Sequence, residues 1–181
     1  MGKITSVSVF CGSAEKVDPA YHKAAARMGA LLAERGIRLV YGGEKAGLLG
    51  VLSNACLAGG GAVTGIIPGF FREKGYANAR VADLITVADL QDRKRAMIER
   101  ADGFIVLAGG LGTLDEAFEA ITTKYAGTHD KPVVFVNTAN YYAPLFSTID
   151  HMVGAGFCAS SHRELYNVAA TPDEALAVLG S

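Results

Sequence analysis

The 181-residue sequence is poor in several features that would narrow its class. It contains three cysteines, an odd number without paired spacing, so a disulfide framework or a zinc site would be hard to build from them. We therefore expect a reducing, cytoplasmic environment. No uncharged apolar run reaches the ~18 residues that a membrane-spanning helix requires, and no basic segment followed by a long apolar one opens the chain. No membrane partner is expected.

Charge and tryptophan are also scarce. Charged residues make up 19% of the chain, the formal net charge is -1, and there is no tryptophan. A neutral balance gives no electrostatic reason to expect nucleic acid as a partner, and no basic stripe is interleaved with aromatic residues. Half of the residues are apolar, and the 22 glycines are scattered among apolar runs. This composition is typical of a globular protein and argues against disorder.

Short apolar runs rich in branched residues recur along the chain, and most are followed by a segment of helical length. The runs are ITSVSVF at 4–10, IRLVY at 37–41, AVTGIIP at 62–68, LITVA at 84–88, GFIVLAGG at 103–110 and KPVVFVN at 131–137. The run at 103–110 is apolar without alternation, which fits a central strand covered on both faces. The pattern predicts one α/β domain over residues 1–181, with a doubly wound, mostly parallel, Rossmann-like sheet and helices on both faces.

The segment between the first two runs has residues that typically start and end a helix. Pro19 stands at a first-turn position and Gly36 at the end, where a left-handed residue often closes a helix. Ala24, Met28 and Leu32 fall on one face at helical spacing. We expect this face to pack on the sheet.

Three glycine-rich turns follow predicted strands, at 10–15, 41–50 and 107–116. In an open parallel sheet, ligands bind beyond the carboxyl ends of the strands, where the strand order reverses. One glycine turn is weak evidence, because tight turns often need glycine for steric reasons. Three such turns converging on one crevice would indicate a binding site.

The third turn, LAGGLGTLDE at 107–116, leads into a predicted helix. A helix start offers unpaired N–H groups and the positive end of the dipole, which together suit a phosphate. An ordinary alternative is a capping box, in which Thr113 and Glu116 only satisfy each other's backbone donors. The chain contains neither a P-loop Gly-Lys-Ser/Thr tripeptide nor a dinucleotide fingerprint after the first strand, so NAD binding is not expected.

A basic segment, DLQDRKRAMIERADGFIVL at 89–107, precedes this turn. Its helical part carries Arg93 and Lys94 near the start and Met97 where it could pack. Basic residues in a first turn oppose the helix dipole, which favours an anion as the partner of Arg93. A solvated basic face that includes Arg95 is the ordinary alternative.

Together these segments resemble the LONELY GUY (LOG) phosphoribohydrolases, a family long mislabelled as lysine decarboxylases. The family pairs a Met-His-x-Arg-Lys segment with Pro-Gly-Gly-x-Gly-Thr-x-x-Glu, and the chain has LQDRK at 90–94 and AGGLGTLDE at 108–116. The likeness extends to VFCGS, YGGEKAGLLG, TGIIP and HDKPVVFVNTANYYAPL. Ala108 replaces the proline, Leu90 and Gln91 replace the Met-His pair, and Glu44 replaces a glycine.

The resemblance implies hydrolysis of the N-glycosidic bond of a nucleoside 5'-monophosphate, with cytokinin ribotides and AMP as substrates. Such a reaction passes through a ribosyl cation, which requires a fixed carboxylate near the anomeric carbon. The resemblance assigns this role to Glu116, with Arg93 as its cationic catalytic partner, and implies no metal or other cofactor and a homodimer. The expected substrate-binding residues are Gly12, Ser13, Gly42, Gly43, Lys94, Gly109, Gly110, Leu111, Gly112, Thr113, Leu114, Asp115 and Thr122.

The sequence alone leaves two questions open. Glu44 near a phosphate crevice would repel an anionic substrate unless Lys45 or another cation offsets it. A non-catalytic nucleotide or molybdenum-cofactor carrier of the same fold is the alternative function, although Arg93 together with Glu116 favours an enzyme.

The remaining candidates have ordinary interpretations. The four histidines show no metal-ligand spacing. Cys11 follows the first predicted strand, where packing of a small buried residue is commoner than nucleophilic use. Tyr141 and Tyr142 lie beyond a predicted strand, and we expect them at a subunit contact.

Overall fold

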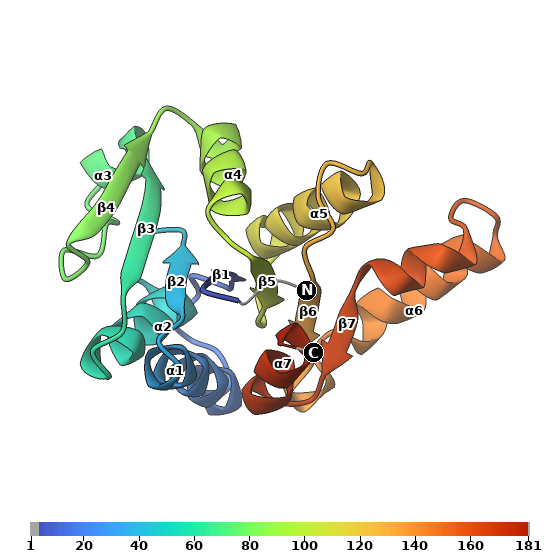
Figure 1. Cartoon of the computed structure of the whole chain (residues 1–181), viewed down its shortest axis with the longest axis horizontal. Coiled ribbons are helices and arrows are strands. Elements are labelled where there is room, and N and C mark those ends of the chain that lie inside the picture. Colours follow the sequence, from blue (N-terminus) through green and yellow to red (C-terminus); the bar gives the residue numbers. More distant parts are fainter. Residues whose placement is uncertain (1–3, 181) are drawn as a thin grey trace.

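A computed structural model describes residues 4–180 of the chain, and all of its named strands belong to one sheet. The strands are β1 (Ser6–Phe10), β2 (Arg38–Tyr41), β3 (Val63–Pro68), β4 (Asp83–Val87), β5 (Gly103–Val106), β6 (Val133–Val136) and β7 (Asn167–Ala169). Their order across the sheet is β4-β3-β2-β1-β5-β6-β7, and every neighbouring pair is parallel (Figure 1). The predicted Rossmann-like sheet is confirmed.

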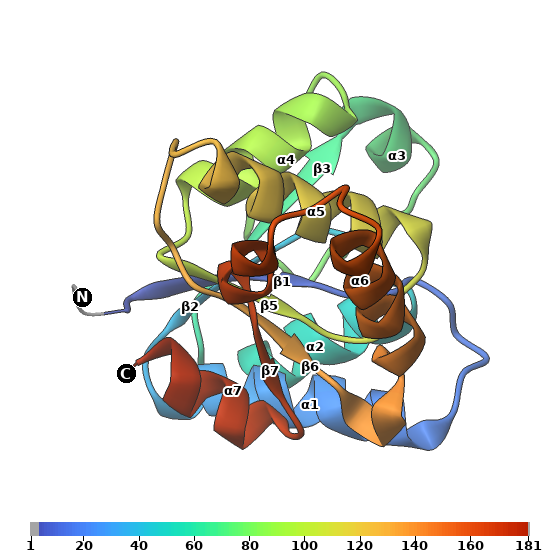
Figure 2. The ribbon, with the colours of Figure 1, turned by 90° about the vertical axis from the view of Figure 1, so that its right-hand side faces the viewer.

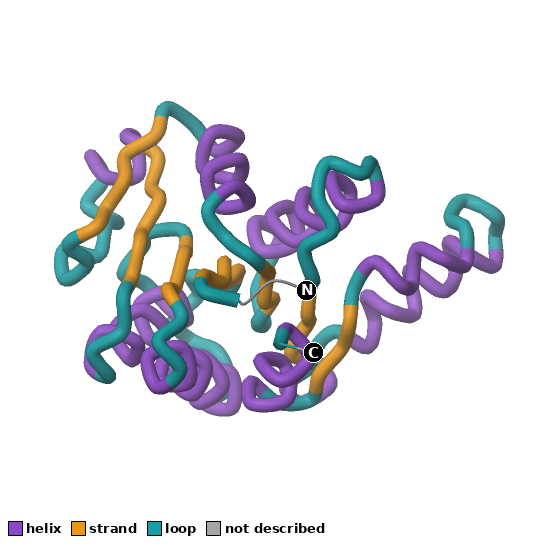
Figure 3. The backbone as a smooth tube through the Cα atoms, in the orientation of Figure 1, coloured by secondary structure: helices purple, strands orange, loops and turns teal. Residues whose placement is uncertain are grey.

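Helices connect successive strands and cover both faces of the sheet. They are α1 (Pro19–Glu34), α2 (Gly47–Ala58), α3 (Gly69–Glu73), α4 (Leu90–Glu99), α5 (Leu111–Tyr125), α6 (Ala143–Gly154) and α7 (Pro172–Leu179), with 3-10 turns η1 (Thr138–Asn140) and η2 (Ser160–Leu165). Figure 3 shows the strands as a central layer, with α1, α2 and α7 on one side and α4 and α5 on the other. The same layers are visible in the rotated view of Figure 2.

Each side of the sheet has its own hydrophobic core. One core joins Met28 and Leu32 of α1 and Leu52 of α2 to the sheet. The other joins Met97 of α4 and Ile121 of α5 to the opposite face. Because β5 packs against helices on both sides, all four of its residues are buried, as the unbroken apolar run predicts.

The predicted start and end signals of α1 are confirmed. Pro19 is the first helical residue, and the Asp18 carboxylate accepts a hydrogen bond from the N–H of Ala20 at 2.8 Å. Beyond the last helical residue, Gly36 has φ of +64°, a left-handed conformation that favours glycine. The helix therefore begins and ends where local chemistry directs it.

Strand β7 was not anticipated from the sequence. It has three residues at the edge of the sheet, and Asn167 and Val168 are exposed. A strand this short, exposed and without a continuous apolar run has no periodic signal that distinguishes it from a loop.

The sheet order reverses direction at β1, which pairs with β2 on one side and with β5 on the other. The chain moves outward through β2, β3 and β4, and then returns across the sheet to β5. The carboxyl ends of β1, β2 and β5 thus meet at one switch point, and the three glycine turns leave the sheet there.

Candidate active site

A cavity of about 440 Å³ lies at this switch point. The predicted convergence of the three glycine turns on one crevice is confirmed, since each of them contributes to its wall. The lining residues are Cys11, Gly12, Ser13, Ala14, Val17, Tyr21, Gly42, Glu44, Leu48, Leu49, Arg93, Ala108, Gly109, Gly110, Leu111, Gly112, Thr113, Glu116 and Tyr141.

Backbone hydrogen bonds hold the three turns together. The N–H of Gly12 donates to the carbonyl of Ala108 at 3.0 Å, and the N–H of Leu48 donates to the carbonyl of Gly12 at 2.9 Å. A Cβ at Gly109 would overlap the Thr113 side chain and lie 2.9 Å from the nitrogen of Gly12. Glycine at 109 is therefore required by the close approach of two turns, whatever the ligand.

The start of α5 differs from the capping box that the sequence also allowed. The helix begins at Leu111 with Gly110 as its N-cap, and no side chain caps it. Thr113 is consequently the third helical residue and Glu116 lies in the second turn, so the capping interpretation is wrong. The first N–H groups of a helix have no acceptor within it, and those of Leu111, Gly112 and Thr113 belong to residues that line the cavity.

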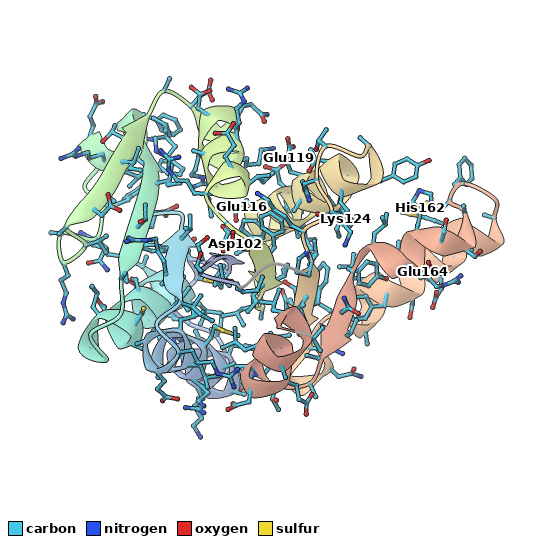
Figure 4. The ribbon with its side chains drawn as sticks, in the orientation of Figure 1. Asp102, Glu116, Glu119, Lys124, His162 and Glu164 are labelled. Carbon is cyan, nitrogen blue, oxygen red and sulfur yellow. The ribbon has the colours of Figure 1, made fainter. Side chains whose placement is uncertain are left out.

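Glu116 and Arg93 form a buried ion pair in the wall of the cavity. Arg93 Nη2 lies 2.9 Å from Glu116 Oε1, and their side chains are 10% and 9% exposed. In Figure 4, Glu116 lies among the side chains between α4 and the sheet. Burial raises the pKa of Glu116 to about 7, with the charge of Glu44 adding to the rise and that of Arg93 opposing it.

The solvated basic face that the sequence allowed for α4 is wrong for its first two basic residues. Arg93 and Lys94 are both buried, whereas Arg95 is exposed and pairs with Asp92 on the same helix at 2.9 Å. Arg93 also lies with its guanidinium carbon 5.9 Å from the centre of the Phe71 ring. Its Nε is buried and has no hydrogen-bond partner among the described residues.

Glu44 contacts the other side of the same guanidinium. Arg93 Nη1 lies 3.4 Å from Glu44 Oε1, and the Glu44 side chain is 14% exposed. Arg93, rather than Lys45, is therefore the cation that contacts Glu44. Burial raises the pKa of Glu44, and Arg93 counteracts part of that rise.

Five of the expected binding residues lie outside the cavity wall: Gly43, Lys94, Leu114, Asp115 and Thr122. Lys94 Nζ lies 2.8 Å from Asp115 and 3.3 Å from Glu119, which ties α4 to α5. The Thr122 hydroxyl donates to the carbonyl of Phe118 on its own helix. Roles of these residues toward a ligand stay predictions.

Two tyrosines that the sequence did not assign to binding line the cavity. The rings of Tyr21, on α1, and Tyr141 meet edge to face with centroids 5.3 Å apart. The Tyr141 hydroxyl donates to the carbonyl of Gly109 at 2.8 Å, so it braces the third turn. No local signal could pair residues from such distant segments, although both lie next to a predicted sheet edge.

Tyr142 and Cys11 are buried in the protein interior. Tyr142 is 2% exposed and donates its hydroxyl to the carbonyl of Leu107 at 2.7 Å, so its expected place at a subunit contact is wrong. Cys11 is 4% exposed within the core next to α1. Burial first, and then Glu116 and Glu44, hold the pKa of its thiol well above the usual range, which suits packing and disfavours a nucleophile.

Residues 4–180 contain neither a candidate membrane span nor a candidate metal centre. Between residues 4 and 180, no helix combines the length and the apolar character needed to cross a bilayer. Nor do three or more His, Cys, Asp or Glu side chains of this part of the chain gather where they could hold a metal ion.

Comparison with known proteins gives strong sequence matches. The family described as "Possible lysine decarboxylase" matches residues 49–179. The cytokinin riboside 5'-monophosphate phosphoribohydrolase of Rhodococcoides fascians is 40% identical over 177 residues, which cover 97% of this chain and 89% of that protein. A cytokinin riboside 5'-monophosphate phosphoribohydrolase of Arabidopsis thaliana is 41% identical over 172 residues, 95% of this chain and 80% of that one.

Solved structures share the fold at much lower identity. The molybdenum cofactor binding protein from Rippkaea orientalis superposes with a TM-score of 0.73 at 21% identity, covering 99% of this chain and 96% of that chain. The Moco carrier protein from Chlamydomonas reinhardtii gives a TM-score of 0.73 at 22% identity, with 98% and 96% covered. These two likenesses establish a common architecture.

Proposed function

The chain belongs to the family described as "Possible lysine decarboxylase", in which its relatives at about 40% identity are phosphoribohydrolases, and from this we propose that it hydrolyses nucleoside 5'-monophosphates. The products are the free base and ribose 5-phosphate. One observation supports the proposal most directly. The buried carboxylate of Glu116 forms an ion pair with Arg93 in the same cavity that contains the uncapped start of α5. The cavity thus contains a helix start suited to binding a phosphate and a carboxyl group suited to acting on the sugar.

The start of α5 is the proposed phosphate site. Gly110, Leu111, Gly112 and Thr113 line the cavity at the positive end of a 15-residue helix, where the first N–H groups have no acceptor within the helix. The absence of a Cβ at 110 and 112 leaves open space beside the backbone, so an anion could approach closely. Binding the 5'-phosphate here fixes one end of the substrate.

Glu116 is the proposed catalytic carboxylate. Breaking the bond between C1' and the base leaves positive charge on the ribose, and a nearby carboxylate stabilises that charge in a site shielded from water. Arg93 holds Glu116 in place through an ion pair, with Nη2 2.9 Å from Oε1. Because the pKa of an arginine stays above about 12, Arg93 orients groups and does not itself protonate the departing base.

The proposed base is adenine, with or without an N6 side chain. Outside α5, the apolar and aromatic residues of the cavity wall include Val17, Tyr21, Leu48, Leu49 and Tyr141. Such a surface suits a planar base with an apolar substituent, because aromatic walls bind planar rings well. Cytokinin ribotides and AMP fit these requirements, and release of active cytokinin would be the physiological role.

The chain is further proposed to act as a homodimer. Leu111, Phe118 and Tyr125 are exposed on α5 to 87%, 36% and 63%, and their seven-residue spacing puts them on one face. Leu111 also lines the cavity, so this apolar face is continuous with the proposed site. A second copy of the chain is the partner we assign to this face.

All three cysteines are free, which suits the reducing cytoplasm that we propose as the compartment of the protein.

A cofactor carrier of the same fold is the competing function, since a solved Moco carrier protein and a solved molybdenum cofactor binding protein share the architecture. A carrier needs a phosphate-binding turn but has no use for a carboxylate at a reacting carbon. Burial raises the pKa of Glu116 from 4.5 to about 7, which lowers the free energy of unfolding as the pH rises through this window. A strongly perturbed acid in a cavity favours a functional role over a purely structural one.

The experiment is a panel of nucleoside 5'-monophosphates, including AMP and an N6-prenylated adenylate, incubated with the protein without added metal or cofactor and separated by chromatography. We expect free base and ribose 5-phosphate in equal amounts. If every nucleotide stays intact while one of them binds, the carrier function replaces the hydrolase.

A further inference from the structure

Two carboxylates share one arginine in the cavity. Nη2 of Arg93 contacts Glu116 at 2.9 Å, and Nη1 contacts Glu44 at 3.4 Å. The three side chains come from different parts of the fold, namely α4, α5 and the turn after β2, and all are at most 14% exposed. A single positive charge cannot neutralise two carboxylates, so one negative charge is in excess when both are ionised.

The position of Glu44 is fixed by the fold. Its turn is pinned to the loop before β4 by the N–H of Lys45 donating to the carbonyl of Tyr76 and the N–H of Asn78 donating to that of Gly43, both at 2.9 Å. Residues 44 and 77 also pair as an isolated antiparallel bridge. Glu44 is therefore held against Arg93 and the cavity by backbone contacts on both sides of it.

We propose that Glu44 is a positioning residue for the hydrolysis: by sharing Arg93 with Glu116, it leaves Glu116 protonated and able to give that proton to the departing base. This inference rests on the proposed function. Glu116 is then the proton donor for the departing base, a role that Arg93 cannot fill.

The charges around Glu116 support this assignment. The groups that act on it are Arg93 and Lys94 from α4, Asp115 from its own helix, Glu44 from the second turn and Cys11 at the end of β1. Glu44 in turn contributes to the raised pKa values of Tyr41 and Cys11, and a phenol or a thiol carries no positive charge that could compensate it. Lys94 is already paired with Asp115 and Glu119, which leaves Arg93 as the one cation shared by the two acids in the cavity wall.

The proton balance of the step is complete. The bond between C1' and the base nitrogen breaks, its electron pair leaves with the base, and the base nitrogen takes the carboxyl proton of Glu116. Glu116 becomes a carboxylate as the ribosyl cation forms beside it, so the same group then stabilises that cation. Water adds its oxygen to C1' and releases a proton to the solvent, and Glu116 recovers a proton from the solvent.

The test compares wild type with Glu44→Gln and Glu44→Asp. Removing the Glu44 charge leaves Arg93 to Glu116 alone, so Glu116 should ionise at a pH lower by about one unit. The alkaline limb of kcat/KM for AMP then moves to lower pH, and the ratio of Glu44→Gln to wild type falls about ten-fold between pH 5 and pH 9. Glu44→Asp, which keeps the charge, should retain the wild-type profile.

A second readout does not depend on turnover. With 13C-labelled glutamate, the carboxyl signal that disappears in Glu116→Gln reports the titration of Glu116. We expect its midpoint near neutral pH in wild type and lower in Glu44→Gln, with Glu44→Ala as a further charge-free variant should the amide disturb folding.

Unchanged midpoints and unchanged pH profiles in the charge-free variants would overturn the inference, while base release by wild type would leave the hydrolase function intact. Absence of base release from any nucleotide would instead count against the proposed function itself.

Discussion

Glu116 is a buried acid that keeps a basic partner and nevertheless has a pKa raised to about 7, because burial and Glu44 outweigh Arg93. A structural ion pair would normally have its acid held ionised by the arginine. The raised pKa places the titration of Glu116 close to neutral pH, where proton transfer to a leaving group is most effective.

Glu116→Gln should separate catalysis from folding. The amide keeps the shape of the side chain but supplies neither a proton nor a negative charge, so turnover should fall at least about 100-fold. Arg93 keeps Glu44 as a partner, so calorimetric AMP affinity should change little, and the melting temperature should change little at pH 4.5, where Glu116 is protonated in the folded state and resembles the amide. Full activity with a loss of about 1 kcal/mol or more of stability would mean that the role of Glu116 is structural.

The pH dependence of stability offers an independent check on Glu116. Its pKa rises from 4.5 to about 7 on folding, so the folded chain binds this proton more tightly than the unfolded chain. The free energy of unfolding therefore falls as the pH rises through this window, by an amount on the order of 3 kcal/mol. Glu116→Gln lacks this contribution, so urea unfolding should find it more stable relative to wild type at pH 8 than at pH 4.5. An equal difference at both values would contradict the raised pKa.

Among single residues, the sequence predicted Glu116 and Arg93 as site residues because both lie in a specific paired signature, and both line the cavity. It also marked Glu44 as a problem, but the contact that offsets its charge joins residues 44 and 93 and has no local pattern. Tyr21 and Tyr141 were missed as cavity residues for the same reason. Long-range side-chain contacts follow from the assembled sheet.

At the scale of elements, the glycines of the third turn have different structural roles. A Cβ at Gly109 would meet Thr113 and the backbone of Gly12, whereas a Cβ at Gly112 would meet no atom within 4 Å. Gly109 thus allows the first and third turns to approach each other, whereas Gly112 lies at the start of α5 with open space beside its Cα. The capping-box alternative would have placed the N-cap at Thr113, three residues after the observed N-cap, because Gly110 as N-cap carries no side-chain signal.

Gly109→Ala should destabilise the fold, and Gly112→Ala should not. The added methyl at 109 must displace backbone, which typically costs about 1–3 kcal/mol or more, whereas alanine in the first helical turn gains up to about 1 kcal/mol over glycine. Chemical denaturation of the two matched variants measures the difference. Equal stability of both variants would contradict the tight packing between the first and third turns.

At the scale of the whole molecule, the sheet was the most predictable feature. Six apolar runs became six strands because buried parallel strands need continuous apolar residues, and the switch point followed from the alternation of strands and helices. Strand β7 and the strand order could not be read from periodicity, since an edge strand of three residues depends on the sheet it joins.

The exposed face of α5 predicts the state of association. Phe118→Glu places a charge in the centre of the apolar stripe and should convert a dimer into a monomer at micromolar concentration, as measured by light scattering. Lys23→Glu, at an exposed position on α1, is the matched control and should leave the mass unchanged. A wild-type protein that is monomeric at high concentration would contradict the proposed homodimer.

The most direct measurement is a crystal structure of Glu116→Gln with bound AMP. We expect the 5'-phosphate on the N–H groups at the start of α5, the base against Tyr21 and Tyr141, and C1' beside the side chain at position 116. A nucleotide bound with C1' remote from that side chain, or with its phosphate away from the helix start, would contradict the proposed function.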